Sequence, residues 1–494
     1  GASWPLIDRL MGRGELPHFA RLVERGHRAR LRSLPKMISP RVWSTICTGC
    51  PPEEHGIWDF NQRKRDFRVG TLWDQLRREG RSFGLCEWYF SWPPEPGRPA
   101  VDFIVPSQIA PDTQTFPDDY RFYRLIVQQS RNQEQGRSRV PLGTYLSAAV
   151  SAWRHGIRLS TLRAAASAVV GRKLGQRSAR DRVWMNRKLS TALEADLLAE
   201  LIRVRGPEFV AALFTQVDAT CHRYWKYMEP EAFGDVSPQD QARYGGVIDA
   251  IYREMDRSLG KLLAVLPARA NILVVSDHGF QAASEKVANW FCRIRTLRLL
   301  AALDLRDRVS GTNVDLEVYL RPTVPGCGAR EALLAQLAAT LGEAHLVGDD
   351  RPLFEIKRDA ETLYVTLAPR LFLPEKPRIL LEGREYPYEE LVRARAQAFW
   401  SGKHHPDGVY LLAGPAAAQA RRADSLHVLD VAPTLAALLD LPVCPRWPGS
   451  PALEGLSLAD VRLSDYARPE MPQSEPQRMS DDLREKLRSL GYLE

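Results

Sequence analysis

The stretch Val274-Val275-Ser276-Asp277-His278-Gly279 decides the predicted fold, because it joins a strand to two potential metal ligands. The run 271–275 is apolar and β-branched and is bounded by turn-forming residues, which is typical of a fully buried strand. Asp277 and His278 follow it directly. Binding sites of α/β proteins lie just outside the carboxyl ends of strands, so this strand end is a candidate site. The alternative is a loop with a solvated aspartate and histidine.

The residues before this stretch predict a parallel sheet. Residues 209–217 form a second apolar run, which ends at Asp218, and residues 244–263 have the apolar spacing of a helix. Strand, helix and strand in this order form a βαβ unit, which implies a parallel sheet. If the chain turns into a helix after residue 217, Asp218 and His222 converge on one face. We therefore predict the α/β class, with a central, mostly parallel sheet sandwiched by helices and with inserted cap regions.

The chain has 494 residues, which suggests two to four structural units. We expect an α/β core in three parts, at 1–105, 201–281 and 399–465. A helical basic insertion is expected at 106–200, a mixed α+β insertion at 282–398 and a tail at 466–494. The basic helices are expected within 145–193. They fit three interpretations: a solvated helical face, a lid over an anionic substrate, or a membrane-surface contact.

The composition limits the binding partners and the cellular compartment that we expect for this protein. The net charge of +8 is spread over a long chain, so anionic partners are allowed and binding to a nucleic-acid duplex is not expected. No uninterrupted apolar run reaches the length of a transmembrane helix. The seven cysteines argue against a disulfide framework and favour a cytoplasmic location, although Cys47 and Cys50 have the spacing of a redox pair. The sequence starts at Gly1 without a methionine, and we expect that residues before Gly1 are missing.

Ser39 is the candidate nucleophile. Pro40 suits the first turn of a helix, which places Ser39 at the N-cap. A hydroxyl at this position lies in the positive field of the helix start, which favours an anion or a developing alkoxide. The alternative is a serine that only caps the helix.

The polar groups at the predicted strand ends form one chemically coherent set. Three imidazoles, two carboxylates and a hydroxyl suit a borderline cation such as zinc; they are Ser39, Asp218, His222, Asp277, His278 and His404. Two ions ~3.5–4 Å apart would stabilise the attacking and the leaving oxygen of an in-line displacement. An ion beside Ser39 would also lower the pKa of its hydroxyl.

Five motifs in this order resemble the alkaline phosphatase superfamily, and most closely its type I phosphodiesterase and nucleotide pyrophosphatase branch. They are Ser39-Pro40 through Thr48-Gly49 to His55-Gly56-Ile57, Asp218-x-x-x-His222, Ser276-Asp277-His278-Gly279, His404-x-Pro406-x-Gly408 and Asp430-Val-Ala-Pro433-Thr434. The family places its nucleophile at the position of Ser39. The resemblance implies one metal held by Asp218, His222 and His404, and a second held by Asp277, His278 and Ser39.

The departures from the family pattern refine this expectation. The family has an Asp at the end of a first strand, just before a Gly like Gly1, and this sequence lacks both the Asp and the strand. Asn61 lies one position away from the Asn that would hold a phosphoryl oxygen, which makes it a candidate substrate-binding residue. Trp43 stands where a sulfatase would carry Arg, which argues against a sulfatase. We expect His55 to be structural.

The expected function is that of a metal-dependent hydrolase of phosphate diesters or monoesters, with a Ser nucleophile and two divalent ions. Zinc is the expected metal, and manganese is the alternative. The partner is a small phosphate ester or a lipid or glycan substrate. Two other functions remain open: a phosphotransferase that moves a phosphoryl-linked group from Ser39 onto a glycan or lipid, and a catalytically impaired binding homologue.

Overall fold

The computed structural model describes residues 1–60, 62–95, 101–134, 142–173, 178–234, 236–283, 292–314, 317–368, 376–394, 401–419, 421–442, 444 and 447–454. The chain forms two compact units: the first contains Gly1–Ala282 and the described residues from Ser401 onward, and the second contains the described residues of Ala283–Trp400. Asn61 and the helix expected at 481–490 lie outside the described residues. The second unit covers nearly the range of the predicted α+β insertion, whereas the basic helices belong to the first unit.

The strands of the first unit form two sheets and one separate pair. Their bounds are β1 (Gly26–Arg32), β2 (Phe83–Cys86), β3 (Val101–Val105), β4 (Phe209–Ala212), β5 (Ile272–Val275), β6 (Gly279–Ala282), β17 (Gly402–His405), β18 (Asp407–Ala413) and β19 (Ser425–His427). One sheet has the order β19-β1-β18-β5, the other has the order β3-β2-β4, and β17 pairs with β6. Strand β2 is parallel to both of its neighbours, and β1 is parallel to β19. Strand β18 is antiparallel to β1 and β5, so the unit contains parallel pairs without being parallel throughout.

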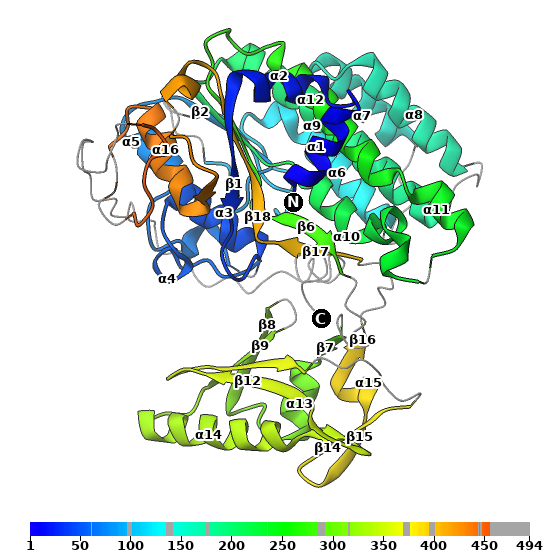
Figure 1. Cartoon of the computed structure of the whole chain (residues 1–494), viewed down its shortest axis with the longest axis vertical. Helices are drawn as coiled ribbons and strands as arrows, with labels where there is room; N and C mark the ends of the chain where they lie inside the picture. The colour runs from blue at the N-terminus through cyan, green and yellow to red at the C-terminus, as the bar shows by residue number, and fades with distance from the viewer. Residues whose placement is uncertain are drawn as a thin grey trace. The chain divides into compact units, whose positions relative to one another are not determined.

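Helices cover both faces of these sheets (Figure 1). Their bounds are α1 (Trp4–Gly12), α2 (Pro17–Arg25), α3 (Ser39–Thr48), α4 (Pro52–His55), α5 (Leu72–Arg78), α6 (Arg121–Glu134), α7 (Leu142–Arg154), α8 (Leu159–Lys173), α9 (Ala179–Arg205), α10 (Gln216–Met228), α11 (Pro238–Tyr244), α12 (Val247–Leu263) and α16 (Val431–Leu438). Leu76 of α5 and Ala436 of α16 pack with Leu85 of β2. Leu197 of α9 packs against Phe103 of β3 in a second cluster. The predicted α/β class, with helices on both sides of the strands, is confirmed.

Strands β4 and β5 differ from the prediction in burial and pairing. We expected fully buried strands in a βαβ unit, but both are only half-buried. Strand β4 pairs with β2 and β5 pairs with β18, and the structure describes no strand between β4 and β5. A cavity of about 1210 Å³ separates them and is lined along its length by residues 209–215 and 270–277. The half-burial of both strands follows from this cavity.

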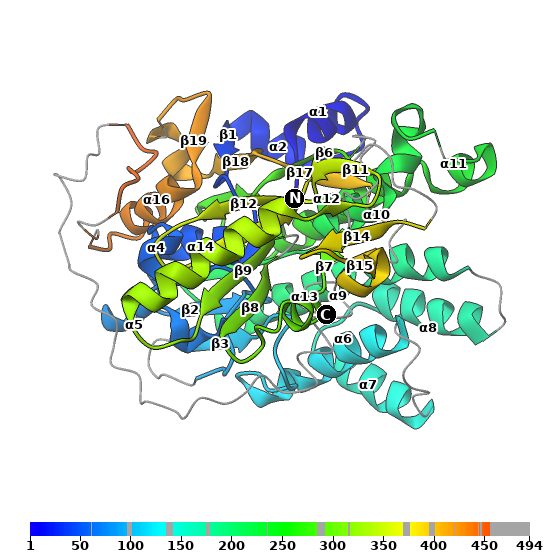
Figure 2. The ribbon, with the colours of Figure 1, turned by 90° about the horizontal axis from the view of Figure 1, so that it is seen from below.

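The second unit has its own apolar core under one long helix. Its elements are β7 (Cys292–Ile294), α13 (Thr296–Ala302), β8 (Val309–Val314), β9 (Glu317–Pro322), α14 (Cys327–Glu343), β10 (His345–Leu346), β11 (Asp349–Pro352), β12 (Phe354–Arg358), β13 (Leu363–Leu367), β14 (Arg378–Leu381), β15 (Arg384–Pro387), α15 (Tyr388–Leu391) and β16 (Val392–Ala394). Figure 2 shows α14 lying across β12 and β9. Leu334 and Leu337 of α14 are buried with Leu320 and Val365 of the sheet. None of the helices that the structure describes could span a bilayer.

Candidate metal centre and nucleophile

Helix α10 places two of the candidate ligands one turn apart. It begins at Gln216, four residues after β4 ends, so Asp218 lies in its first turn and His222 lies one turn later. Residues four apart on a helix share a face, as the sequence predicts for a chain that turns into a helix here. The Nε2 atom of His222 is 3.7 Å from Oδ1 of Asp218.

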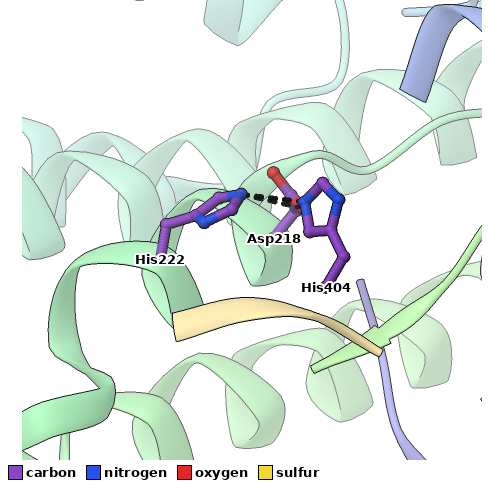
Figure 3. A group of neighbouring side chains, drawn as sticks. All are labelled: Asp218, His222 and His404. Atoms are coloured by element: carbon purple, nitrogen blue, oxygen red, sulfur yellow. Dashed lines mark hydrogen bonds and ion pairs between the residues drawn. The ribbon is translucent and has the colours of Figure 1, made fainter. Parts of the chain in front are cut away.

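Strand β17 brings His404 to the same point from a distant part of the sequence. Pairing of β17 with β6 sets His404 opposite Phe280. Its Nε2 atom lies 3.5 Å from Oδ1 of Asp218 and 3.0 Å from Nε2 of His222 (Figure 3). One ligand atom from each of Asp218, His222 and His404 lies within 4.8 Å of the others. The three side chains can therefore coordinate a single ion together.

Backbone carbonyl groups fix the orientation of all three imidazoles. The Nδ1 atoms of His222, His404 and His278 lie 2.9, 2.8 and 3.1 Å from the carbonyl oxygens of Gly402, Met37 and Gly279, respectively. A carbonyl oxygen can only accept a hydrogen bond, so Nδ1 carries the proton and Nε2 of each neutral ring presents a lone pair. This arrangement of the second ring nitrogen is typical of metal-binding histidines.

Asp277 and His278 follow β5 and lie beside this group. The Nε2 atom of His278 is 3.2 Å from Oδ2 of Asp277 and 3.7 Å from Oδ1 of Asp218. The ring of His278 stacks on that of His404, with 3.5 Å between their centroids. The backbone nitrogen of Gly1 lies 2.9 Å from Oδ1 of Asp277. Five of the six predicted metal-site residues therefore form one continuous group.

Close backbone packing explains the glycines of two of the motifs. A Cβ atom on Gly279 would lie 2.2 Å from the carbonyl oxygen of Asp407, and one on Gly408 would lie 2.3 Å from that of Ser276. Both distances are far below van der Waals contact, so a side chain at either position would push β18 away from the end of β5. The two glycines thus keep the segments that carry His278 and His404 together.

Burial and mutual charge set the protonation of the group. Burial lowers the pKa of His222 to about 3, against the opposing effect of the Asp218 carboxylate. Burial would raise the pKa of Asp218, but His222, His404 and His278 outweigh it and hold this pKa below its usual range. Near pH 7 the site therefore presents a neutral imidazole at His222 beside an ionised carboxylate, which are the forms that bind a cation.

The hydrogen bonds of the site leave a place for a positive charge. Oδ1 of Asp218 is buried and accepts no hydrogen bond from the described residues. The Nε2 atoms of His222 and His404 face each other at 3.0 Å, a distance at which two lone pairs repel unless a proton or a metal cation lies between them. The donor set of one carboxylate and two imidazoles also suits zinc. The residues present therefore fit a divalent metal ion.

Ser39 lies at the start of α3, one position later than predicted. Ile38 is the N-cap and Ser39 is the first helical residue, because the Val42 N–H donates to the carbonyl of Ile38. As the first helical residue, Ser39 lies in the positive field of the helix start. Ser39 lines the same cavity as Asp218 and Asp277.

The other residues singled out from the sequence have structural surroundings. His55 is fully buried, contacts Thr45 Oγ1 through Nε2 at 3.1 Å and accepts from the Ile57 N–H, so it fixes the turn after α3. Cys47 and Cys50 are buried free thiols, and burial raises the pKa of Cys47. Both cysteines lack the exposed environment of a redox pair, and Cys47 also lacks the low pKa of a reactive thiol.

Two functional contacts could not have been found from the sequence. The carbonyls of Met37 and Gly402 orient His404 and His222, and every residue has such a carbonyl. Met37 also links a metal ligand to the candidate nucleophile, because its carbonyl contacts His404 and it lies two residues before Ser39.

Comparisons with known proteins agree with this arrangement of motifs. The family described as "Type I phosphodiesterase / nucleotide pyrophosphatase" matches residues 1–321, which include Ser39, Asp218 and His278. No curated protein matches the chain.

The solved structures that resemble the chain are distant in sequence. Phosphonoacetate hydrolase from Sinorhizobium meliloti 1021, in complex with phosphonoacetate, is 14% identical over 84% of this chain and 87% of its own, with a TM-score of 0.42. Wild type alkaline phosphatase PafA is 13% identical over 91% of this chain and 96% of its own, with a TM-score of 0.49. The family match covers well over half of the chain, so this protein belongs to the type I phosphodiesterase / nucleotide pyrophosphatase family and is a hydrolase of phosphoric ester bonds.

Proposed function

We propose that this protein hydrolyses small phosphate esters, diesters or monoesters, through Ser39 and two divalent metal ions. The observation that carries the proposal is the convergence of three oriented Nε2 lone pairs, from His222, His278 and His404, on the carboxylate of Asp218. Three imidazoles that are each fixed at Nδ1 by a carbonyl are poorly explained by packing alone. They are the usual way to prepare nitrogen ligands for a metal.

Ser39 is the nucleophile in this proposal. Its oxygen attacks phosphorus, the new Ser–O–P bond forms and the bond to the leaving alkoxide breaks. The proton lost by the hydroxyl ends on the leaving oxygen, which departs as an alcohol. The first turn of α3 supplies unpaired N–H groups whose positive field stabilises the serine oxygen as its proton leaves. Water then attacks the phosphoryl-serine, which frees the hydroxyl of Ser39 and releases the second product.

We assign the ligands to two ions. Asp218, His222 and His404 hold one ion, and Asp277, His278 and Ser39 hold the other. Zinc is the proposed metal, because imidazole and carboxylate ligands suit it, and manganese is the alternative. When bound, such ions lower the pKa of the serine hydroxyl and neutralise the phosphoryl oxygens.

The proposed setting is a reducing compartment, with a small-molecule phosphate ester as the partner. All seven cysteines are free thiols, and six of them are buried. This supports a cytoplasmic location, where thiols stay reduced.

Turnover of an aryl phosphodiester by Ser39→Ala tests the proposal. Loss of the nucleophile is expected to lower kcat by at least about 10³-fold while the ion assigned to Asp218, His222 and His404 stays bound. Ser44→Ala is the matched control, because Ser44 lies on the same helix and its buried hydroxyl has no hydrogen-bond partner among the described residues. The control should keep parental activity. Parental turnover by Ser39→Ala would refute the role of Ser39.

A further inference from the structure

The hairpin of α7 and α8, which the reaction does not use, has an exceptional composition. Between Glu134 and Asp181 the sequence contains no aspartate or glutamate. The same segment holds nine basic residues, which are Arg137, Arg139, Arg154, Arg158, Arg163, Arg172, Lys173, Arg177 and Arg180. A solvated helical face normally mixes both signs of charge. This segment is instead uniformly cationic.

The turn between α7 and α8 carries large apolar side chains in water. Trp153 is 67% exposed, Leu159 is 55% exposed and Val150 is 49% exposed. Leu125 of α6, the helix that packs against α7, is 40% exposed. These four are most of the exposed large apolar side chains in the described part of the chain. Val150 and Trp153 lie near the end of α7 and Leu159 begins α8, and Figure 2 shows these two helices side by side with α6.

The opposite side of the same turn is firmly attached to the core. Ala152 and Ile157 are buried against α9 in an apolar cluster. Thr161 Oγ1 donates to the buried carboxylate of Asp196 at 2.6 Å, and the Arg158 N–H donates to it at 3.0 Å. Lys261 of α12 also contacts Asp196, at 2.6 Å. The turn is therefore held in place, and the exposure of Trp153 and Leu159 is a consequence of their outward position.

From these observations we propose that the α7–α8 hairpin docks on the surface of an anionic lipid bilayer. Trp153, Leu159 and Val150 enter the interfacial region, where an aromatic ring and short apolar side chains are favoured. Arg154 and Arg163, both exposed, lie beside the anionic headgroups. The hairpin itself carries no acid, which an anionic surface would repel; Glu200 of α9, which lies against Gly156 of the turn, is paired with Arg203 at 2.7 Å. The proposal is independent of the reaction at Ser39.

Flotation with lipid vesicles tests the proposal on the full chain. The protein is expected to float with phosphatidylcholine vesicles that contain phosphatidylglycerol and not with phosphatidylcholine alone, and added salt should release it because it screens the arginines. Arg154→Gln/Arg163→Gln should weaken binding by about 30-fold, since each basic residue near such a surface contributes about one factor of five. The control Arg330→Gln/Arg358→Gln removes two exposed charges from the second unit and should bind like the parent.

A second pair of variants distinguishes binding to a bilayer from binding to polyanions in general. Trp153→Ser should lose binding, whereas Leu297→Ser, at a site 62% exposed in the second unit, should keep it. Thermal unfolding checks that each variant is folded. Equal binding of parent and Trp153→Ser, or parental binding by the double arginine variant, would overturn the proposal. So would binding to heparin that competes with vesicles and does not depend on Trp153, because the hairpin would then bind polyanions in general.

Discussion

His404 and His405 are neighbours in the sequence with different surroundings in the structure. Successive residues of a strand point to opposite faces, and His404 alone of the two reaches Asp218 and His222. Nδ1 of His405 instead accepts the N–H of Asp407 at 3.1 Å. The spacing to Pro406 and Gly408 selects His404 from the sequence, and the structure brings that residue into the group.

This difference gives a matched pair of substitutions at the residue scale. His404→Ala removes one of three ligands and is expected to weaken zinc binding by about 100-fold or more, since even an outer contact contributes 10–100-fold. His405→Ala should bind zinc like the parent. Zinc titration by calorimetry measures both. Equal affinities of the two variants would show that His404 is not a ligand.

At the scale of the elements, local patterns were predicted well and long-range pairings were not. The four-residue spacing of Asp218 and His222 predicts their shared helix face, because that geometry is local. The antiparallel pairing of β18 with β1 and β5 joins residues far apart in the sequence. No periodicity within β18 encodes its neighbours, so the sequence alone did not give these pairings.

The position of Ser39 illustrates the limit of motif reading at a helix end. Pro40 fits either of the first two helical positions, so the sequence could not decide between Ser39 as the N-cap and Ser39 as the first helical residue. The carbonyl of Ile38, which accepts the first helical hydrogen bond, decides it in the structure.

Glu194 of α9 makes a pH-dependent contact to the start of α10. It is buried and accepts a hydrogen bond from Gln216 Nε2 at 2.8 Å. Burial, followed by the nearby Glu87 carboxylate, raises the pKa of Glu194 well above its usual value. The contribution of Glu194 to the free energy of unfolding is therefore fully present below the pKa of a glutamate in the unfolded chain, about 4.3. It is lost as the pH rises towards the pKa of Glu194 in the folded protein.

Glu194→Gln is therefore expected to flatten the dependence of stability on pH. The amide keeps the hydrogen bond from Gln216 and cannot ionise, so the free energy of unfolding should fall less between pH 5 and pH 8 than in the parent. The difference can reach about 1.4 kcal/mol per pH unit. Denaturant unfolding measures it, with exposed Glu24→Gln as the control. The same pH dependence in parent and Glu194→Gln would contradict the assignment.

At the scale of the whole molecule, the two units have separate apolar cores. Leu76 is buried with the strands of the first unit, and Leu337 is buried under α14 in the second. A buried Leu→Ala substitution costs about 2–5 kcal/mol. Leu337→Ala is therefore expected to lower the midpoint temperature of one calorimetric transition, and Leu76→Ala that of another. Added zinc should raise only the midpoint of the transition that Leu76→Ala lowers. A single transition that both substitutions lower together would contradict this division.

The most direct test of the account is the mass of the covalent intermediate. The protein is mixed with excess diester substrate, quenched in acid within one turnover and digested, and the peptide that contains Ser39 is analysed by mass spectrometry. The account predicts a phosphoryl-linked adduct on Ser39 in the parent and in Ser44→Ala, and none in Ser39→Ala. Turnover by the parent with an unmodified Ser39 peptide under these conditions, or an adduct on another residue, would contradict it.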